Sequence, residues 1–169
     1  VFGAVYAHDA SALSFHEWFA TGDGDHQREA LTLQRTGEYT DFVGGFHPQM
    51  LLAAASSFTP NLGRLPSQVD LPWKVDGDAV KRIDAVWAKW LRFDPLHSLP
   101  LYADNMRQLR GIALDGGLHV EAGTNLGSAR AFHEGLVDAG IEHEYEEYEG
   151  AHGDTTRQQV ETRILPFFS

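Results

Sequence analysis

Runs of apolar residues alternate with polar, glycine-rich and proline-rich segments, and their periodicity predicts the order of strands and helices. Residues 1–8 combine β-branched and aromatic side chains and predict a buried strand. Residues 111–115 predict a second strand, which ends at two glycines. Residues 141–148 alternate Ile, His and Tyr with Glu, which predicts a strand with one solvated face at an edge of the sheet.

Four segments have the features of helices: 48–57, 78–92, 126–139 and 155–167. Asp78 is the predicted N-cap of the second, and Pro95 and Pro100 are expected to end it, before another helical turn at 102–109. Gly140 is expected to close the third, whose predicted buried face is Ala129, Phe132, Leu136 and Val137. Residues 9–45 are expected to be irregular and 58–77 extended. Alternating strands and helices predict an α/β fold with a mostly parallel sheet covered on both faces.

Length and composition predict one globular domain over 1–169. The net charge of -11 argues against nucleic acid and against anionic membrane surfaces as partners. The chain has no cysteine, which excludes disulfides, thiolate metal sites and cysteine nucleophiles. It also has no apolar run of about 18 residues that could span a membrane. We therefore expect a soluble protein; its compartment stays open, with the cytoplasm slightly favoured.

One histidine stands out by its position. His152 lies in a Gly-Ala-His-Gly-Asp turn after a predicted strand, and acidic residues follow the strand before it. A base and an orienting acid placed in this way form two thirds of a nucleophilic hydrolase triad. No Gly-x-Ser-x-Gly motif occurs in the 169 residues, so the third member is not recognisable in this chain.

Several motifs together resemble the esterase branch of the α/β-hydrolase fold that includes esterase D-like, enterochelin and feruloyl or acetyl-xylan esterases. The resemblance covers roughly the C-terminal half of such a fold. The chain shows a Phe-Gly-Ala-Val-Tyr-Ala strand, a Leu-Asp-x-Gly turn, a helix ending Leu-x-x-Ala-Gly-Ile, a His-Glu-Tyr-Glu-x-Tyr strand and a Gly-x-His turn. These motifs are moderately specific together and weak one at a time.

The resemblance implies a partial α/β-hydrolase fold whose N-terminal half, with the nucleophile elbow, lies outside this chain. It implies a serine carboxylic-ester hydrolase that acts on a small-molecule ester, without a cofactor or metal. His152 would take the serine proton and return it to the leaving alkoxide. We expect the other half of the fold as a second polypeptide or a further segment. Residues 58–105 would be an inserted connection in a region that often covers the site.

The resemblance leaves the triad acid open. The family's usual position for it corresponds to Val120, which cannot orient an imidazole. The adjacent Glu121 is the favoured candidate, because Glu serves as triad acid in this fold. Asp115 is the second candidate, although it would also suit a turn-capping carboxylate. A third alternative is that the chain holds no working acid.

Three further residues are candidates for contact with substrate. His8 and Asp9 follow the first strand, at the rim where α/β sheets bind ligands. Trp87 lies in the connection before the acid strand. Core packing is the default role of Trp87, but from that region it could also touch the acyl or leaving group.

Two other functions stay open. The first is a non-catalytic α/β module for binding or assembly, which the missing elbow supports. The second is a metal-assisted hydrolase built on His8, Asp9, His16 and the Asp23/Asp25 loop. That loop lacks the ligand spacing and the closing Glu of a calcium loop, so a solvated acidic loop is the simpler interpretation.

Overall fold

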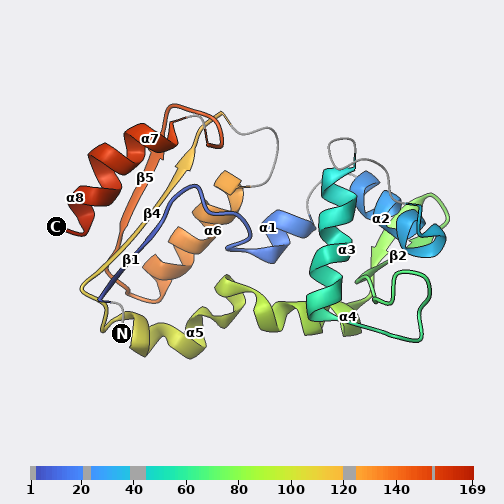
Figure 1. Ribbon diagram of the computed structural model, residues 1–169. Coiled ribbons are helices and arrows are strands. Elements are labelled where there is room, and N and C mark those ends of the chain that lie inside the picture. The colour runs from blue at the N-terminus through green and yellow to red at the C-terminus, as the bar shows by residue number, and fades with distance from the viewer. Residues whose placement is uncertain (1–2, 21–23, 39–44, 120–124, 154) are drawn as a thin grey trace. The chain divides into compact units, whose positions relative to one another are not determined.

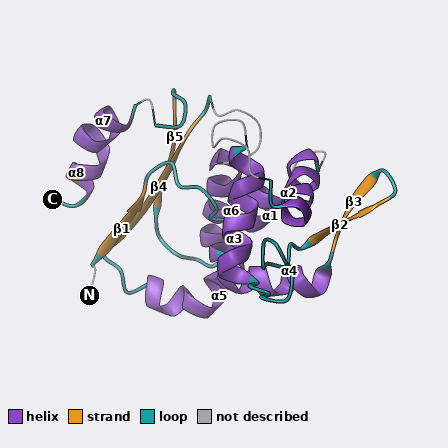
Figure 2. Cartoon of the chain, turned by 45° about the vertical axis from the view of Figure 1, so that its right-hand side comes forward, coloured by secondary structure: helices purple, strands orange, loops and turns teal. Residues whose placement is uncertain are grey.

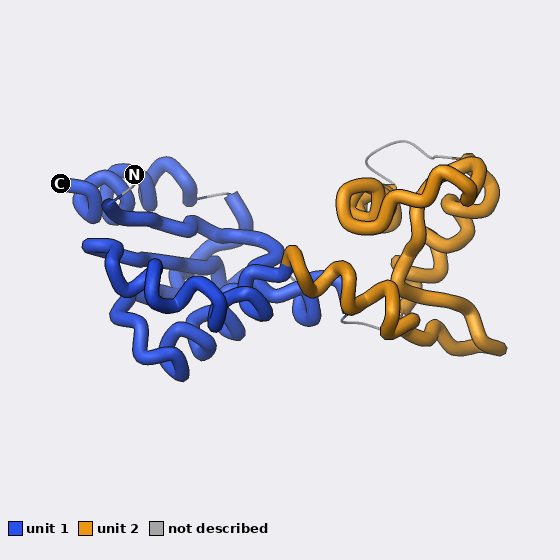
Figure 3. The backbone as a smooth tube through the Cα atoms, turned by 90° about the horizontal axis from the view of Figure 1, so that it is seen from below, with its two compact units in different colours: residues 1–21, 94–169 blue, residues 22–93 orange. Residues whose placement is uncertain are grey.

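The protein folds as two compact units in the computed structural model (Figures 1 and 3). The structure describes residues 3–20, 24–38, 45–119, 125–153 and 155–169. Unit 1 comprises Val1–Thr21 with Asp94–Ser169, and unit 2 comprises Gly22–Phe93. The connection expected at 58–105 therefore spans the end of unit 2 and the first helix that follows it in unit 1.

Unit 1 contains a parallel sheet of three strands. Its order is β1 (Ala4–Ala7), β4 (Gly111–Gly117) and β5 (Glu144–Tyr148). Ala4 pairs with Gly111 and Ala113 with Glu144, and both pairings are parallel. The central strand is buried from Ile112 onward, as expected for a strand covered on both faces. The α/β class is confirmed, and β5 lies at an edge of the sheet that the described residues form.

Helices cover both faces of this sheet (Figures 1 and 2). Ile112 and Leu114 pack in one core with α5 (Pro95–Met106) and α6 (Asn125–Asp138). On the other face, the ring of Phe167 meets Tyr6 edge-on at a centroid distance of 5.4 Å. Phe167 ends a continuous helical segment of α7 (Thr156–Gln159), the π-helical η2 (Val160–Ile164) and α8 (Leu165–Phe167). The short helix α1 (Phe15–Phe19) contacts α6.

The predicted inner face of α6 is correct except at one position. Ala129 and Leu136 are almost completely buried, whereas Val137 is 57% exposed. The buried residues recur at helical spacing, and Val137 lies one step beyond Leu136, on the margin of that stripe.

Before residue 60, the structure corrects one expectation about helices and confirms another. The segment 9–45 was expected to be irregular, but it contains α1 and the 12-residue helix α2 (Asp25–Thr36). Gly37 ends α2 in the left-handed conformation with φ 70°, so a glycine within the segment expected to be irregular is a helix cap. The helix predicted at 48–57 is confirmed as α3 (Phe46–Phe58).

The helix predicted at 78–92 begins later than expected. Its first part is the strand β3 (Ala79–Arg82), which forms a hairpin with the preceding β2 (Trp73–Asp76), and Asp76 pairs with Ala79. The two residues that connect the strands are Gly77 and Asp78, and Gly77 has φ 62°. A two-residue Gly-Asp connection is a hairpin signal, and here it outweighs the helical spacing of the apolar residues. The helix α4 spans Asp84–Trp90 and continues into the 3-10 turn η1 (Leu91–Phe93).

The two prolines after this helix have different roles from those expected. Pro95 starts α5 at its first turn, where Asp94 caps the helix by accepting a hydrogen bond from the backbone N–H of His97. Pro100 lies inside α5, so it does not end a helix. The helical turn expected at 102–109 is found over 102–106, as the end of α5.

A hydrogen-bonded ion pair joins α6 to β5. Arg130 donates to both carboxylate oxygens of Glu147 at 2.7 Å, and Tyr145 donates to Glu147 Oε1 at 2.7 Å. The bonds from Arg130 are the main cause that lowers the pKa of Glu147 from its ordinary 4.5 to about 2. The folded state therefore favours the ionised carboxylate more than the unfolded chain does.

This shift predicts an acid-dependent loss of stability. Since the folded pKa is depressed, the stabilisation is fully present above about pH 4.5 and is lost as the pH falls toward 2. We expect Glu147→Gln to lower the melting temperature by a few degrees at pH 7 and to reduce its dependence on pH over that range. Thermal unfolding followed by circular dichroism at several pH values measures both. Equal pH dependence in Glu147→Gln and in the parent protein would contradict the prediction; Glu161→Gln, at an exposed pair with Arg157, is the matched control.

Among the described residues, no helix combines the length and the apolar character needed to cross a lipid bilayer.

Candidate functional site

The candidate site lies where the three parallel strands end. Residues His8 and Asp9 directly follow β1, Asp115 lies near the end of β4, and His152 is on the loop that follows β5. The carboxyl ends of parallel strands share one edge of a sheet, which is the usual place for ligand and catalytic sites in this fold class. The strand order therefore assembles residues that are more than a hundred positions apart.

His152 is paired with Asp9. The Nδ1 atom of His152 lies 2.6 Å from Asp9 Oδ2, and the backbone N–H of Gly153 donates to the same oxygen at 3.2 Å. The Asp9 side chain is 3% exposed, whereas the His152 side chain is 60% exposed. Since an ionised carboxylate only accepts hydrogen bonds, this contact assigns the hydrogen to Nδ1 and leaves Nε2 as the basic nitrogen of a neutral ring.

The backbone at Asp9 directs its carboxylate toward the histidine loop. Asp9 has φ 45°, in the left-handed region that Asp tolerates better than most residues. Its backbone N–H donates to Asp115 Oδ1 at 2.8 Å, which holds this turn against the end of β4. On the loop, Gly153 has φ 84°, where a side chain would be strained. Both turns therefore depend on residue types that accept left-handed conformations.

Asp115 has three donors around its carboxylate. In addition to the Asp9 N–H, the Tyr6 hydroxyl donates to Oδ2 at 2.9 Å and His8 Nδ1 lies 2.9 Å from Oδ1. Asp115 is 1% exposed. Burial is the main cause that raises the pKa of Tyr6, and the bond to Asp115 raises it further, so the phenol keeps its proton at neutral pH. Asp115 thus serves as a buried acceptor for residues at the end of β1.

A close approach of two backbones brings the His152 loop over the end of β4. A Cβ atom at Gly117 would come within 2.6 Å of the Gly150 carbonyl oxygen. The backbone N–H groups of Leu118 and His119 donate to the carbonyls of Tyr148 and Gly150, each at 2.9 Å. The loop that carries His152 is therefore attached to the chain leaving β4 by main-chain bonds that only a glycine at 117 permits.

The predicted site residues are distributed as follows. The structure brings His152 and Asp9 together, and it brings His8 and Asp115 together beside them. Asp9 was expected to line a substrate pocket, so its contact with His152 went unrecognised in the sequence. Glu121 and Val120 lie outside the described residues. The position of Asp9 after a predicted parallel strand marks it as a candidate site residue. That position does not show which side chain it contacts.

Trp87 occupies the core of unit 2. It is 5% exposed, and its ring lies 6.0 Å from Trp73 and 6.1 Å from Trp90 between centroids. Trp90 is fully buried and donates from Nε1 to Thr59 Oγ1 at 2.9 Å. This environment is the core packing that the sequence allowed for Trp87, and a contact with substrate stays a prediction.

The residues of the metal-assisted alternative are divided between the two units. His8, Asp9 and His16 belong to unit 1, Asp25 belongs to unit 2, and Asp23 lies outside the described residues. Within the part of the chain that the structure describes, no group of three or more His, Asp or Glu side chains could hold a metal ion.

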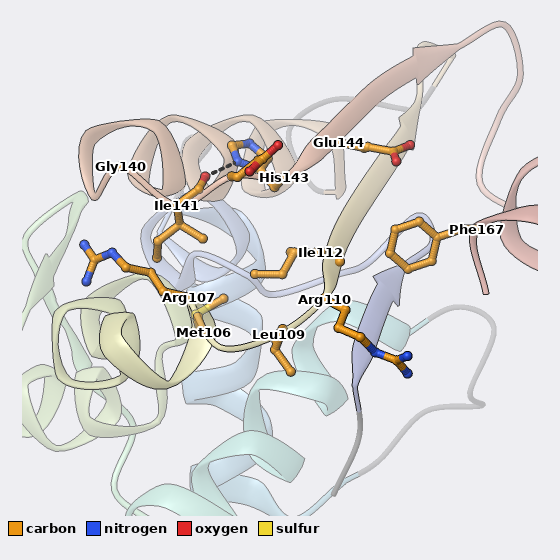
Figure 4. A pocket seen from close by; sticks show the side chains of 12 residues that line it. Met106, Arg107, Leu109, Arg110, Ile112, Gly140, Ile141, His143, Glu144 and Phe167 are labelled. Atoms are coloured by element: carbon orange, nitrogen blue, oxygen red, sulfur yellow. Dashed lines mark hydrogen bonds between the residues drawn. The ribbon is translucent and has the colours of Figure 1, made fainter. Parts of the chain in front are cut away.

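A separate cavity of about 380 Å³ lies at the opposite edge of the sheet (Figure 4). It is lined by Gly111 and Glu144, at the starts of β4 and β5, and by apolar residues such as Ile112 and Phe167. None of the four site residues His8, Asp9, Asp115 and His152 lines it. Its position at the amino ends of the strands separates it from the candidate site.

Comparison with models of known protein families gives no match to this chain, and comparison with curated proteins gives no similar sequence.

Proposed function

We propose that this chain supplies the histidine and the acid of a serine carboxylic-ester hydrolase, with His152 as general base and Asp9 as its orienting acid. The observation that carries the proposal is the 2.6 Å contact between His152 Nδ1 and the buried Asp9 carboxylate at the carboxyl edge of a parallel sheet. Asp9 takes the role for which the sequence suggested Glu121 or Asp115. The nucleophilic serine would lie on a segment or polypeptide outside these 169 residues.

The chemistry proposed for the pair follows from its geometry. Asp9 holds the ring with its hydrogen on Nδ1, so that Nε2 can take the proton of a serine hydroxyl as the serine attacks an ester carbonyl. The positive charge that forms on the ring is then stabilised by the carboxylate, which Gly153 N–H also contacts. As the tetrahedral intermediate collapses, Nε2 would return the proton to the leaving alkoxide. In the second half of the reaction, Nε2 would take a proton from the water that attacks the acyl-enzyme and return it to the serine oxygen as the acid leaves. The groups that hold the oxyanion would come from the same additional segment as the serine.

The free side of β1 is the proposed position of that segment. Within the described residues, β1 pairs only with β4 and therefore has one unpaired edge. Val5, in the middle of this strand, is 42% exposed. An exposed apolar strand edge favours pairing with a further strand. Such a strand would extend the sheet beyond β1, the strand that Asp9 follows.

A fluorophosphonate probe, combined with intact-mass measurement of every polypeptide in the purified protein, tests the proposal. We expect the label on a serine outside the 169 residues, and we expect His152→Ala to slow labelling strongly because the serine loses its base. A label within this chain, for example on Ser11, would overturn the placement of the nucleophile. If no polypeptide is labelled, the esterase proposal fails, and the non-catalytic α/β module becomes the better interpretation.

A further inference from the structure

A second His–Asp pair lies directly beside the first. His8 Nδ1 is 2.9 Å from Oδ1 and 3.1 Å from Oδ2 of Asp115. The His8 side chain is 17% exposed, and its ring is stacked on Tyr148 at a centroid distance of 6.0 Å. The two pairs are linked through the main chain, because the Asp9 N–H donates to the carboxylate of Asp115 at 2.8 Å.

Thr156 connects this second pair to the loop that carries His152. Its Oγ1 lies 3.4 Å from His8 Nε2 and donates to the Gly153 carbonyl at 3.1 Å. Gly153 in turn donates from its N–H to Asp9 Oδ2 at 3.2 Å. The contacts form a closed ring of five residues: Asp115, His8, Thr156, Gly153 and Asp9.

His152 is attached to this ring at Asp9 Oδ2, the atom that Gly153 also contacts. Any displacement of Gly153 would therefore change the geometry of the His152–Asp9 bond. The loop is held on one side by main-chain bonds to the chain after β4. On the other side, the contact between His8 and Thr156 fixes the first turn of α7.

We propose that His8 and Thr156 are positioning residues. They hold the loop that carries His152 so that its Nδ1 stays within hydrogen-bond distance of Asp9 Oδ2. The effect of this positioning on catalysis rests on the proposed function, whereas the contacts themselves do not. His8 acts through Asp115 and Thr156, which engage its two ring nitrogens. The 3.4 Å contact between His8 and Thr156 is the longest in the ring. Its loss should therefore change the alignment of His152 with Asp9 only moderately.

Substitutions at both ends of the contact test this role. Thr156→Val removes the hydroxyl and keeps the side-chain volume. His8→Asn keeps an amide donor for Asp115 but loses the ring nitrogen that faces Thr156. Since loss of one hydrogen bond corresponds to a moderate change in free energy, each variant should lower kcat for ester hydrolysis by about three- to ten-fold, with KM unchanged.

The double variant gives the sharper test. Both substitutions break the contact between His8 and Thr156, and Thr156→Val also removes the bond to the Gly153 carbonyl. His8→Asn with Thr156→Val should therefore lower kcat no further than Thr156→Val does alone. Thr156→Ser, which restores the hydroxyl, should recover most of the rate. Thr162→Val is the matched control, since Thr162 donates to the Gln158 carbonyl within the same helical segment; it should leave kcat unchanged. Multiplicative losses in the double variant would overturn the proposal.

Proton NMR of the His152 ring separates this proposal from the esterase proposal. In the parent protein, the Nδ1 hydrogen bonded to Asp9 should give a resolved low-field signal. Thr156→Val should shift that signal or speed its exchange with water, and Thr162→Val should not. An unchanged signal in Thr156→Val overturns the positioning role, whether or not the protein hydrolyses esters. A shifted signal in a protein without esterase activity keeps the positioning role and removes only the proposed reaction.

Discussion

Replacing His152 with alanine is expected to lower kcat for ester hydrolysis by about 10⁴-fold or more, because the members of a catalytic triad act as a unit. The substitution removes the only group proposed to take the serine proton. Because the His152 side chain is 60% exposed, the fold should be kept. Steady-state hydrolysis of p-nitrophenyl acetate, by the chain together with the polypeptide that carries the nucleophile, measures the effect.

His119→Ala is the matched control for this prediction. His119 follows β4, is 66% exposed and pairs with Glu149 at 2.6 Å, so it resembles His152 in exposure and in having a carboxylate partner. That partner is itself 78% exposed, and an exposed pair of this kind contributes little. We expect a change in kcat of less than about two-fold in His119→Ala. Turnover within about ten-fold of the parent in His152→Ala would show that His152 is not the general base.

Replacing Asp9 with asparagine is expected to lower kcat by about 10³- to 10⁴-fold, with little change in KM. Asparagine has almost the same shape and also tolerates the left-handed conformation that Asp9 adopts, so the turn should survive. The neutral amide can present a donor to Nδ1, which favours the wrong tautomer of His152, and it cannot stabilise the charged ring. The same hydrolysis assay and the thermal stability of the variant measure the two effects separately.

Comparison with two other carboxylates shows whether Asp9 is the acid. Asp104→Asn is the control, since Asp104 is 96% exposed and pairs only with Arg107 among the residues described. Glu121→Gln tests the candidate favoured by sequence. A large loss in Glu121→Gln with a small one in Asp9→Asn would reverse the assignment, and the acid would then lie on the segment after β4.

The strands and the helix α6 could be predicted from the sequence because their signals are local. Residues 111–117 form an apolar run that suits a strand buried on both faces, and the alternation at 144–148 suits an edge strand. The apolar stripe of α6 and its closing glycine carry enough information to place that helix within one residue. These features depend on neighbours within one element.

Predictions were wrong where two local signals competed. The apolar spacing at 78–92 favoured a helix, but the turn at Gly77 and strand pairing made a hairpin of its first part. Residues 9–45 were expected to be irregular, but they include Gly37, which in the left-handed conformation ends the helix α2. Pro100 is tolerated within α5, where a sequence rule predicted an end.

By itself, the sequence determined the α/β class, the three strands of the sheet and the position of His152 on a loop after the last of them. It also showed that the chain contains no recognisable nucleophile elbow. Only the tertiary structure decided that Asp9 is the carboxylate against His152, and that Asp115 is a buried acceptor for Tyr6, His8 and the Asp9 backbone. The physical reason is that parallel pairing brings strand ends together across 143 positions of sequence, while periodicity and spacing report only on residues within one element.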